Sequence, residues 1–249
     1  MVISTSSWIS CPVPHKKTDV IRQIASVPGA GVPGYLVANN HEAAGACLQW
    51  LLDRVVSPDD ALREGRTPSF DQLVDVGSSA PAGAGGVLFT PWLAGKRSPV
   101  DDRSARGGFH DLSLRTSRAD MVRAALEGEA YNARWLHESV ERFVKRRLEP
   151  IRVFGGGALS ALWCQIHADV MDRSVEQLAD PRRTGLRGAA MLAGLALGDI
   201  DRASVPALVA VEATFRPDPS RRAVYDALYG EFPGLYKAQK ATFGRLNRQ

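Results

Sequence analysis

The amino-acid sequence predicts an α/β fold built as one domain. Short runs of apolar and β-branched residues alternate along the chain with segments whose apolar residues recur at helical spacing, and this alternation is typical of a sheet covered by helices. No segment is repeated, which excludes a solenoid or a propeller. With 249 residues, of which 45% are hydrophobic and 23% charged, the chain can bury a core without disulfides.

Composition excludes several other classes of protein. No apolar run approaches the length of about 18 residues that a transmembrane helix needs. The N-terminal segment lacks the basic lead and apolar stretch of a signal peptide. Three cysteines are too few and too scattered for a disulfide framework. We therefore expect a cytoplasmic protein with no membrane partner.

The formal net charge of +4 raises the alternative of nucleic-acid binding. The basic residues form short, separate clusters at 145–147, 182–183 and 221–222, without aromatic residues interleaved as stacking platforms. A solvated surface explains this pattern better, so we expect no nucleic-acid partner.

The N-terminal elements follow from local composition. β-Branched and hydroxyl residues in the first ten positions predict a strand or hairpin, closed by Pro12 and Pro14. Residues 16–34 show no clear period and are expected to be irregular, and residues 35–38 form a short apolar strand. Asn39, with Glu42 three positions later, predicts a capped helix that runs to about Val55.

The central elements carry clearer signals. Ser69 and Gln72 form a capping-box pair that opens a short helix, and residues 77–86 read as a flexible loop. Residues 87–90 predict a buried strand. Ser117 and Asp120 open the longest helix, which must end before Pro150.

The C-terminal third alternates again. We expect a strand at 151–154, a glycine turn at 155–157 and a helix from 159 to about 171. Residues 188–197 consist of small and apolar residues and predict a helix buried against a close neighbour. We expect a final helix that contains Tyr225 and Tyr229.

Several familiar motifs occur in the sequence, but the residues around them do not support the corresponding function. Gly29-x-Gly31-x-x-Gly34 matches the dinucleotide-binding string, but Pro33 interrupts it and no helix follows. Lys96 follows a glycine as in a phosphate-binding loop, but Arg97 occupies the position of the required Ser or Thr. Histidines and cysteines lack metal-ligand spacing, and no Gly-x-Ser-x-Gly elbow occurs. Metalloenzyme and hydrolase functions are therefore not supported.

The candidate binding features that remain are turns rich in glycine or hydroxyl residues, each next to a predicted strand. The turn at 155–157 precedes a helix, and glycine lets a ligand approach the backbone there. Residues 5–7 at the hairpin tip offer hydroxyl and backbone donors to a phosphate, and Gly45 leaves room against its helix. Each feature also has an ordinary structural explanation: a tight connection, a plain strand, or close helix packing.

Taken in order, these segments resemble the C-terminal half of an FGGY-type carbohydrate kinase, most like the xylulokinase branch. Each match is weak alone, but the order and spacing are specific. The matching segments are 5–10, 42–51, 91–99, 106–127, 155–160, 163–169 and 188–190, followed by Phe215, Tyr225 and Tyr229.

The resemblance implies an actin-like ATPase, ribonuclease-H-like domain with a mixed sheet flanked by helices. Residues 1–249 would form the nucleotide-binding domain, without the N-terminal sugar-binding domain. The implied cofactors are ATP and Mg²⁺, and the implied reaction transfers the γ-phosphoryl group to a sugar hydroxyl, of a xylulose-like ketose. The residues implied for nucleotide binding are Thr5, Ser6, Gly45, Gln49, Gly156, Gly157 and Ser160.

Departures from the family pattern keep two functions open. Ser4 replaces a glycine before the Thr-Ser pair, and Asp111 and Ser160-Ala161 also depart from the usual residues. The general-base Asp of the family lies in a Gly-Asp motif expected upstream of this chain, and Gly198-Asp199 cannot be that motif. The chain is therefore either half of a sugar kinase or a non-catalytic, degenerate nucleotide-binding remnant. The face around Trp92 is expected to bind a separately encoded N-terminal half or a second copy.

Overall fold

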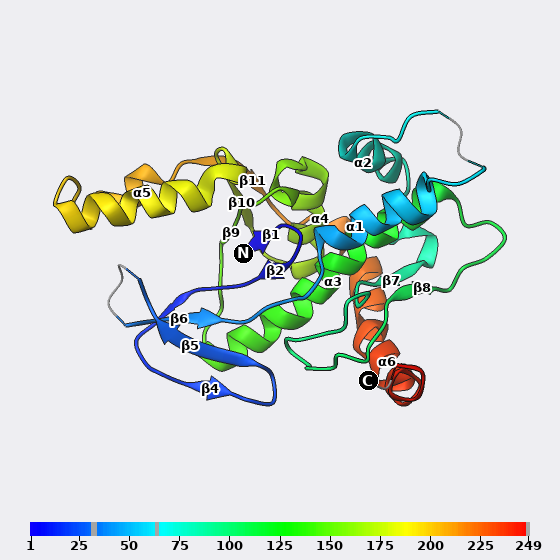
Figure 1. The fold of residues 1–249 in the computed structure, drawn as a ribbon, viewed down its shortest axis with the longest axis horizontal. Coiled ribbons are helices and arrows are strands. Elements are labelled where there is room, and N and C mark those ends of the chain that lie inside the picture. Colours follow the sequence, from blue (N-terminus) through cyan, green and yellow to red (C-terminus); the bar gives the residue numbers. More distant parts are fainter. Residues whose placement is uncertain (31–33, 63–64, 248–249) are drawn as a thin grey trace.

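The N-terminal hairpin sits at the middle of the molecule. The computed structural model describes residues 1–30, 34–62 and 65–247 (Figure 1). Strands β1 (Val2–Ile3) and β2 (Ser7–Trp8) pair antiparallel, as predicted. The Ile3 N–H also donates to the Phe154 carbonyl over 2.9 Å. The hairpin is thereby joined to a strand some 150 positions later in the chain.

Four strands within residues 12–30 and 34–38 form an antiparallel sheet, where the segment 16–34 was expected to be irregular. Ile24 and Ser26 both point inward from the third of these strands. Because Ser26 occupies an inward position, the sequence does not show the alternation of apolar and polar residues that is typical of a strand. The buried Ser26 hydroxyl donates to the His15 carbonyl at 2.9 Å. The strand order is β3-β6-β5-β4. The strands are β3 (Pro12–Val13), β4 (Thr18–Asp19), β5 (Ile24–Pro28) and β6 (Tyr35–Ala38). Part of the glycine string at 29–34 lies outside the described residues.

The first helix starts later than the sequence predicts. α1 spans Gly45–Leu51 and continues as a π-helical segment over Leu52–Val56. Asn39 does not cap it. Instead the Asn39 side chain accepts from the Ile9 N–H at 3.0 Å and donates to the Ile9 carbonyl at 2.6 Å. Pairing with the hairpin wins over capping because both polar ends of the amide are satisfied there.

The two central helices begin where their capping boxes predict. Ser69 caps α2 (Phe70–Ser78) together with Gln72, and Ser117 caps α3 (Arg118–Val144) together with Asp120. α2 takes up the start of the predicted loop at 77–86. Between the two helices, β7 (Leu88–Thr90) pairs antiparallel with β8 (Gly108–His110).

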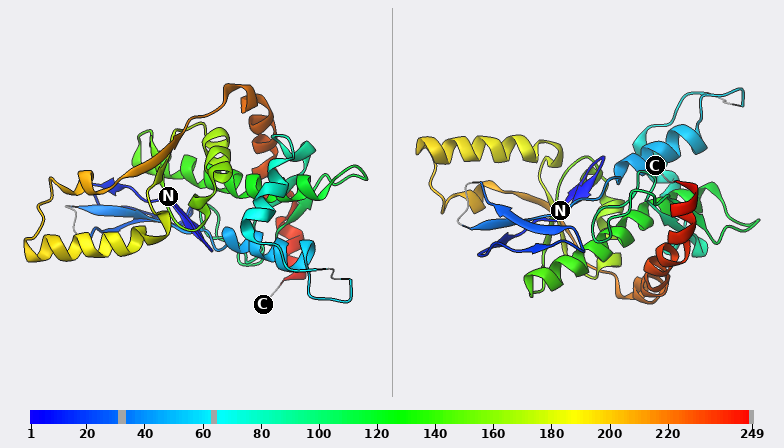
Figure 2. Two further views of the ribbon diagram at one scale, coloured as in Figure 1. Left: turned by 90° about the horizontal axis from the view of Figure 1, so that it is seen from above. Right: turned by 60° about the horizontal axis from the view of Figure 1, so that its bottom comes forward.

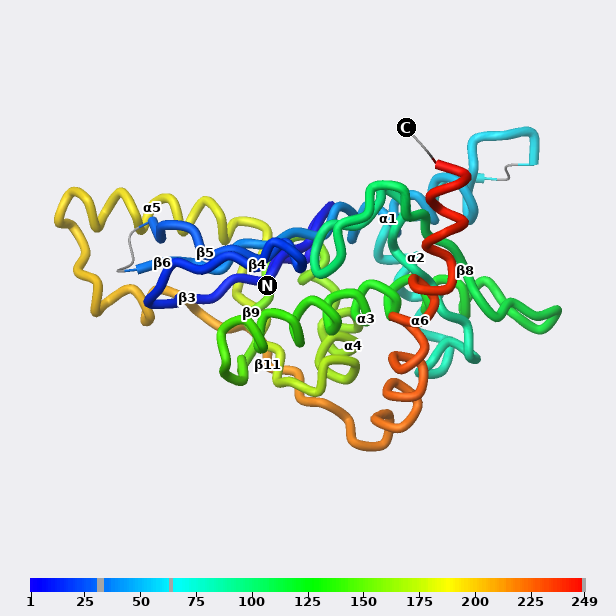
Figure 3. The backbone as a smooth tube through the Cα atoms, turned by 90° about the horizontal axis from the view of Figure 1, so that it is seen from below, coloured from blue at the N-terminus to red at the C-terminus, as the bar shows by residue number. Residues whose placement is uncertain are grey.

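A mixed three-stranded sheet completes the α/β fold, as predicted. β9 (Ile151–Val153) pairs parallel with β10 (Val175–Leu178), which pairs antiparallel with β11 (Val211–Phe215). α4 (Ala161–Met171) and α3 pack together beside this sheet, and α6 (Arg222–Leu246) crosses the other end of α3 (Figure 3). No helix in the described part of the chain is long and apolar enough to cross a membrane.

Two expectations about burial are wrong. Trp92 is only 1% exposed and packs edge-on against Phe232 at 5.5 Å between ring centres, so it belongs to the core and not to a binding face. The small-residue helix does form, as α5 (Thr184–Leu197), but none of its residues is buried. Figures 1 and 2 show α5, in yellow, extending outward from the rest of the chain.

Candidate nucleotide-binding site

A cavity of about 450 Å³ opens between the N-terminal hairpin, α1, α2 and the glycine turn that follows β9. This volume suits a ligand of nucleotide size. Six of the seven residues predicted for nucleotide binding line it, namely Thr5, Gly45, Gln49, Gly156, Gly157 and Ser160. Ser6 does not line it, although its carbonyl accepts from the Ser4 N–H at 3.1 Å and so shapes the hairpin turn.

The hairpin turn and the start of α1 are bonded backbone to backbone. The Ser4 carbonyl accepts from the Gly45 N–H at 2.8 Å, and the Thr5 carbonyl accepts from the N–H groups of Ala44 and Ala46 at 2.8 and 3.2 Å. The first donors of α1 are therefore not available to an anion. Thr5 itself is exposed and lines the cavity.

Gly45 lines the cavity and also allows a close contact with the hairpin backbone. A Cβ atom at this position would lie 2.7 Å from the Ser4 carbonyl oxygen, closer than any side chain tolerates. The glycine thus allows α1 to approach the hairpin, which is the close-packing explanation that the sequence left open.

The glycines of the turn after β9 have different roles. A Cβ atom on Gly157 would run into Ile3 and the Trp163 ring, so this glycine is required for packing. Around Gly156, in contrast, no atom lies within 4 Å of a Cβ position, and its backbone is right-handed helical, with φ −62°. The N–H groups of Gly156 and Gly157 have no acceptor among the described residues. Gly156 is therefore the glycine that faces the open cavity.

Four polar side chains surround the rest of the opening, namely Gln49, Asp71, Ser160 and Arg182. Gln49 donates to the Asp53 carboxylate at 2.8 Å, which fixes its amide and leaves the carbonyl oxygen for a ligand. The Ser160 hydroxyl accepts from the Trp163 N–H at 3.1 Å as the cap of α4, and its own proton remains to donate. Arg182 is the cation of the described lining. In the sequence Arg182 belongs to a short basic cluster that was expected to be solvated, although its position just after β10 was a signal.

An apolar wall faces these polar groups. Leu48 of α1, Val74 and Phe70 of α2, Leu159 and Trp163 contribute to it. The contribution of α2 was not predicted from the sequence, because only the tertiary fold brings that helix to the same cavity as the glycine turn. An apolar slot with hydroxyl, backbone N–H and guanidinium donors at its mouth fits the base, ribose and phosphates of a nucleotide. The described residues contain no cluster of three or more acidic, His or Cys side chains that could hold a metal ion.

A buried polar cluster holds the hairpin in place. The Ser7 hydroxyl donates to Glu129 of α3 at 2.9 Å and lies 2.9 Å from Nδ1 of His41. All three side chains are buried, and the backbone N–H of His41 also donates to the Ser7 carbonyl at 2.7 Å. The cluster therefore ties the hairpin to both α3 and the segment before α1.

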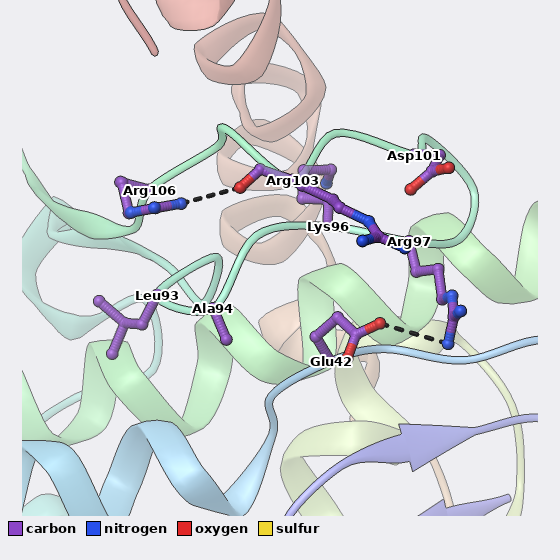
Figure 4. Close-up of a pocket in the computed structure, with 8 residues that line it drawn as sticks. All are labelled: Glu42, Leu93, Ala94, Lys96, Arg97, Asp101, Arg103 and Arg106. Atoms are coloured by element: carbon purple, nitrogen blue, oxygen red, sulfur yellow. Dashed lines mark hydrogen bonds and ion pairs between the residues drawn. The ribbon is translucent and has the colours of Figure 1, made fainter. Parts of the chain in front are cut away.

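A second cavity, of about 510 Å³, lies on the loop between β7 and β8 (Figure 4). Its lining is strongly basic, and its charged residues are Glu42, Lys96, Arg97, Asp101, Arg103 and Arg106. Arg97 pairs with Glu42 at 3.4 Å. Arg106 donates to the Arg103 carbonyl at 2.9 Å, so part of its charge serves to shape the loop.

The buried Lys96 side chain anchors this loop to the aromatic core. Its ammonium group lies 4.2 Å from the ring centre of Trp92 and 4.1 Å from that of Trp135, and it has no hydrogen-bond acceptor in the described structure. Burial lowers the pKa of Lys96 well below its ordinary value, against the opposing attraction of Asp102. The aromatic faces partly replace the water that the ammonium group has lost.

The hairpin, the glycine turn and the cavity between them belong to one α/β domain with a candidate nucleotide site. The C-terminal domain model of the FGGY family of carbohydrate kinases matches residues 6–197, and the chain belongs to this family. It is 32% identical over 202 residues to a xylulose kinase of Staphylococcus epidermidis, covering 80% of this chain and 38% of that protein. It is 35% identical over 191 residues to a glycerol kinase of Haemophilus influenzae, with 76% of this chain and 35% of that protein covered.

Solved structures agree with the predicted actin-like fold. The xylulose kinase of Rhodospirillum rubrum superimposes with a TM-score of 0.81 and 30% identity, over 97% of this chain and 47% of that one. The gluconate kinase of Lactobacillus acidophilus gives a TM-score of 0.83 at 24% identity, over 98% and 48%. The chain thus spans less than half the length of these relatives. Because they include xylulose, glycerol and gluconate kinases, the family membership does not fix the sugar.

Proposed function

We propose that this chain is the nucleotide-binding half of an ATP-dependent sugar kinase that transfers the γ-phosphoryl group of ATP to a hydroxyl of a xylulose-like ketose. The observation that carries the proposal is the 450 Å³ cavity in which the hairpin hydroxyl of Thr5, the open backbone at Gly156 and the cap at Ser160 come together. Residues 1–249 would act as one nucleotide-binding domain.

The residues that line the cavity would each bind a different part of the nucleotide, according to their chemistry. Thr5, supported by the turn at Ser6, would donate to the phosphates, and the guanidinium of Arg182 would neutralise their charge. The free N–H groups of Gly156 and Gly157 would bind the ribose and α-phosphate region. Ser160 and the apolar wall would hold the adenosine end. Mg²⁺ would be held mainly by phosphate oxygens and water, and would neutralise charge that develops during transfer.

Proton removal from the sugar hydroxyl needs a carboxylate beside that hydroxyl. The carboxylate of the described cavity lining is Asp71 of α2, which lies beside the apolar wall that would hold the adenosine end. The general-base Asp is expected upstream, in the part of the relatives that this chain does not cover. Gly198 ends α5 in a left-handed conformation, with φ 81°, which gives Gly198-Asp199 a structural explanation. Phosphoryl transfer would therefore require the sugar-binding half as partner, on the same or a separate polypeptide.

The alternative is a nucleotide-binding remnant without catalysis. Ser4 favours it, because this residue lines the cavity where the family has glycine, and its side chain takes space beside the phosphates. Binding of ATP without transfer in the presence of a sugar-binding half would be the signature of this alternative.

Calorimetric titration with MgATP tests the proposal. Gly156→Leu would fill the cavity without disturbing the fold, because the backbone is right-handed and the Cβ position is open. We expect it to weaken binding at least tenfold. Gly230→Leu is the matched control, since this glycine is exposed in α6 with equally open space around it.

A chimera tests the transfer step. In it this chain replaces the C-terminal half of the Rhodospirillum rubrum xylulose kinase, whose fold it matches over 97% of its length. We expect MgATP-dependent phosphorylation, fastest with xylulose among xylulose, glycerol and gluconate. A chimera that binds MgATP but phosphorylates none of them supports the remnant, and absence of binding in both the chain and the chimera refutes both readings.

A further inference from the structure

The cavity on the loop between β7 and β8 gathers like charges that its own carboxylates do not fully neutralise. We call it the basic loop cavity. It has a volume of about 510 Å³, and its lining includes three arginines and two carboxylates. These residues are Arg97, Arg103, Arg106, Glu42 and Asp101.

The backbone of the loop explains why the arginines share this side. Lys96 and Asp102 form an antiparallel bridge, in which each N–H donates to the carbonyl of the other residue, at 2.8 and 3.1 Å. Their side chains turn toward α6, where the Asp102 carboxylate accepts from the Tyr236 hydroxyl at 2.9 Å. Arg97 and Arg103 each follow one of the two bridged residues. Because successive side chains on paired segments point to opposite faces, both arginines are directed away from the core and into the cavity.

The three arginines differ in what they already bind. Arg106 donates to the carbonyls of Arg103 and Ala105, at 2.9 and 2.7 Å, and so shapes the loop. Arg97 lies 3.4 Å from the Glu42 carboxylate, and the two side chains are 48% and 38% exposed. A pair of this kind contributes little to stability and yields readily to a stronger acceptor.

Arg103 is the cation that the protein leaves unpaired. Its guanidinium has no hydrogen-bond or ion-pair partner among the described residues. Figure 4 shows its side chain extending along the cavity toward Arg97. The bridged backbone keeps these two like charges on one side of the loop, and an anion between them would relieve their repulsion.

We infer that the basic loop cavity binds a small phosphate ester, with the phosphate group between Arg97 and Arg103. A phosphate group carries close to two negative charges at pH 7 and three terminal oxygens, so it can accept from both guanidinium groups at once. A carboxylate has one charge and two oxygens, and it matches a single guanidinium. Leu93 and Ala94 give the cavity a less polar side, against which the carbon skeleton of the ester would lie.

The basic loop cavity is separate from the candidate nucleotide site. No described residue lines both cavities. Glu42 lines the first and Gly45 lines the second, and the Ala44 N–H between them donates to the Thr5 carbonyl at 2.8 Å. This inference therefore goes beyond the proposed function and does not depend on it.

Calorimetric titration with ribose 5-phosphate, and separately with inorganic phosphate, tests the inference. Arg103→Gln removes the unpaired guanidinium and breaks no side-chain bond of the described structure. We expect it to weaken binding of the ester about tenfold or more. Arg115→Gln is the matched control, because this exposed arginine follows β8 and does not line the cavity, and it should bind the ester like the wild type. Equal midpoints of thermal unfolding check that both variants are folded.

Two further titrations define the site and the ligand. Gly156→Leu fills the nucleotide cavity alone, so it should bind ribose 5-phosphate like the wild type. The ester should bind more tightly than inorganic phosphate, because only the ester has a carbon skeleton to contact Leu93.

Four results would overturn the inference. Absence of binding by both ligands would refute it outright. Loss of ester binding in Gly156→Leu but not in Arg103→Gln would mean that the phosphate enters the nucleotide cavity. Equal weakening in Arg103→Gln and Arg115→Gln would show attraction to surface charge alone. Equal affinity for the ester and for inorganic phosphate would show that the cavity does not recognise an ester. Because no nucleotide is used, failure of MgATP binding would refute the proposed function and leave this site standing.

Discussion

The Ser7 hydroxyl, in the N-terminal hairpin, donates a 2.9 Å hydrogen bond to the Glu129 carboxylate in the middle of α3, 122 positions away. Both residues are buried, and His41 completes the cluster from the segment before α1. This link fixes where Thr5 lies relative to the glycine turn. The geometry of the candidate nucleotide site thus depends on a polar contact outside the cavity.

Ser7→Ala is expected to destabilise the protein. It leaves the Glu129 carboxylate and the His41 ring without their shared partner in a buried position, at a cost of about 1–3 kcal/mol. Urea unfolding measures this cost, and Ser10→Ala, in the same segment but less buried, is the control. A free energy of unfolding equal to that of the wild type would show that the cluster does not hold the hairpin.

Gly45→Ala is expected to push α1 away from the hairpin. The added Cβ meets the Ser4 carbonyl oxygen at 2.7 Å, and strain of this kind costs about 1–3 kcal/mol. Gly188→Ala, in the open face of α5, is expected to be neutral or to stabilise by up to about 1 kcal/mol, because alanine favours a helix. Thermal unfolding of both variants makes the comparison. Equal effects would refute the close-packing role of Gly45.

Arg182→Gln is expected to weaken MgATP binding about tenfold, because one cation beside a phosphate is removed. Arg183→Gln is the control, since its guanidinium pairs with Asp180 at the surface at 3.5 Å and does not line the cavity. Calorimetry at two salt concentrations measures both. If the two variants bind alike, the phosphates do not lie at Arg182.

Lys96→Met is expected to change how stability depends on pH. Burial depresses the pKa of Lys96 in the folded state, so the unfolded chain binds the extra proton. The free energy of unfolding of the wild type should therefore rise relative to that of Lys96→Met as the pH increases toward about 10, by at most about 1.4 kcal/mol per pH unit. Urea unfolding from pH 7 to 10 checks the slope. Parallel pH profiles would show that Lys96 is not desolvated.

His167 is expected to contribute to acid unfolding. Burial lowers its pKa to about 4, and Nδ1 is held at 2.8 Å from the Trp163 carbonyl. The contribution is complete above the ordinary value near 6.5 and is lost as the pH falls toward 4, amounting to about 3 kcal/mol. His167→Asn should flatten this part of the curve, although not fully, because the pKa of His137 is also lowered to about 4 by burial. An unchanged curve between pH 7 and 4 would contradict the assignment.

Local chemistry determined much of the fold. The capping pairs at Ser69 and Ser117 act over three residues, and the structure begins α2 and α3 where they predict. The glycine turn after β9 and the hairpin were likewise predictable, because glycine and β-branched residues constrain the backbone near them. Their order along the chain carried the family resemblance that the comparisons confirm.

The tertiary structure decided which surfaces these elements share. The sequence predicted that Asn39 caps a helix. In the structure its side-chain amide instead forms hydrogen bonds with the N–H and the carbonyl of Ile9, which follows the hairpin. Arg182 and α2 reach the cavity only because distant segments meet there. α5 was predicted to be buried because its residues are apolar. Its apolar composition favours burial, but only the arrangement of the described chain shows that none of its residues is buried.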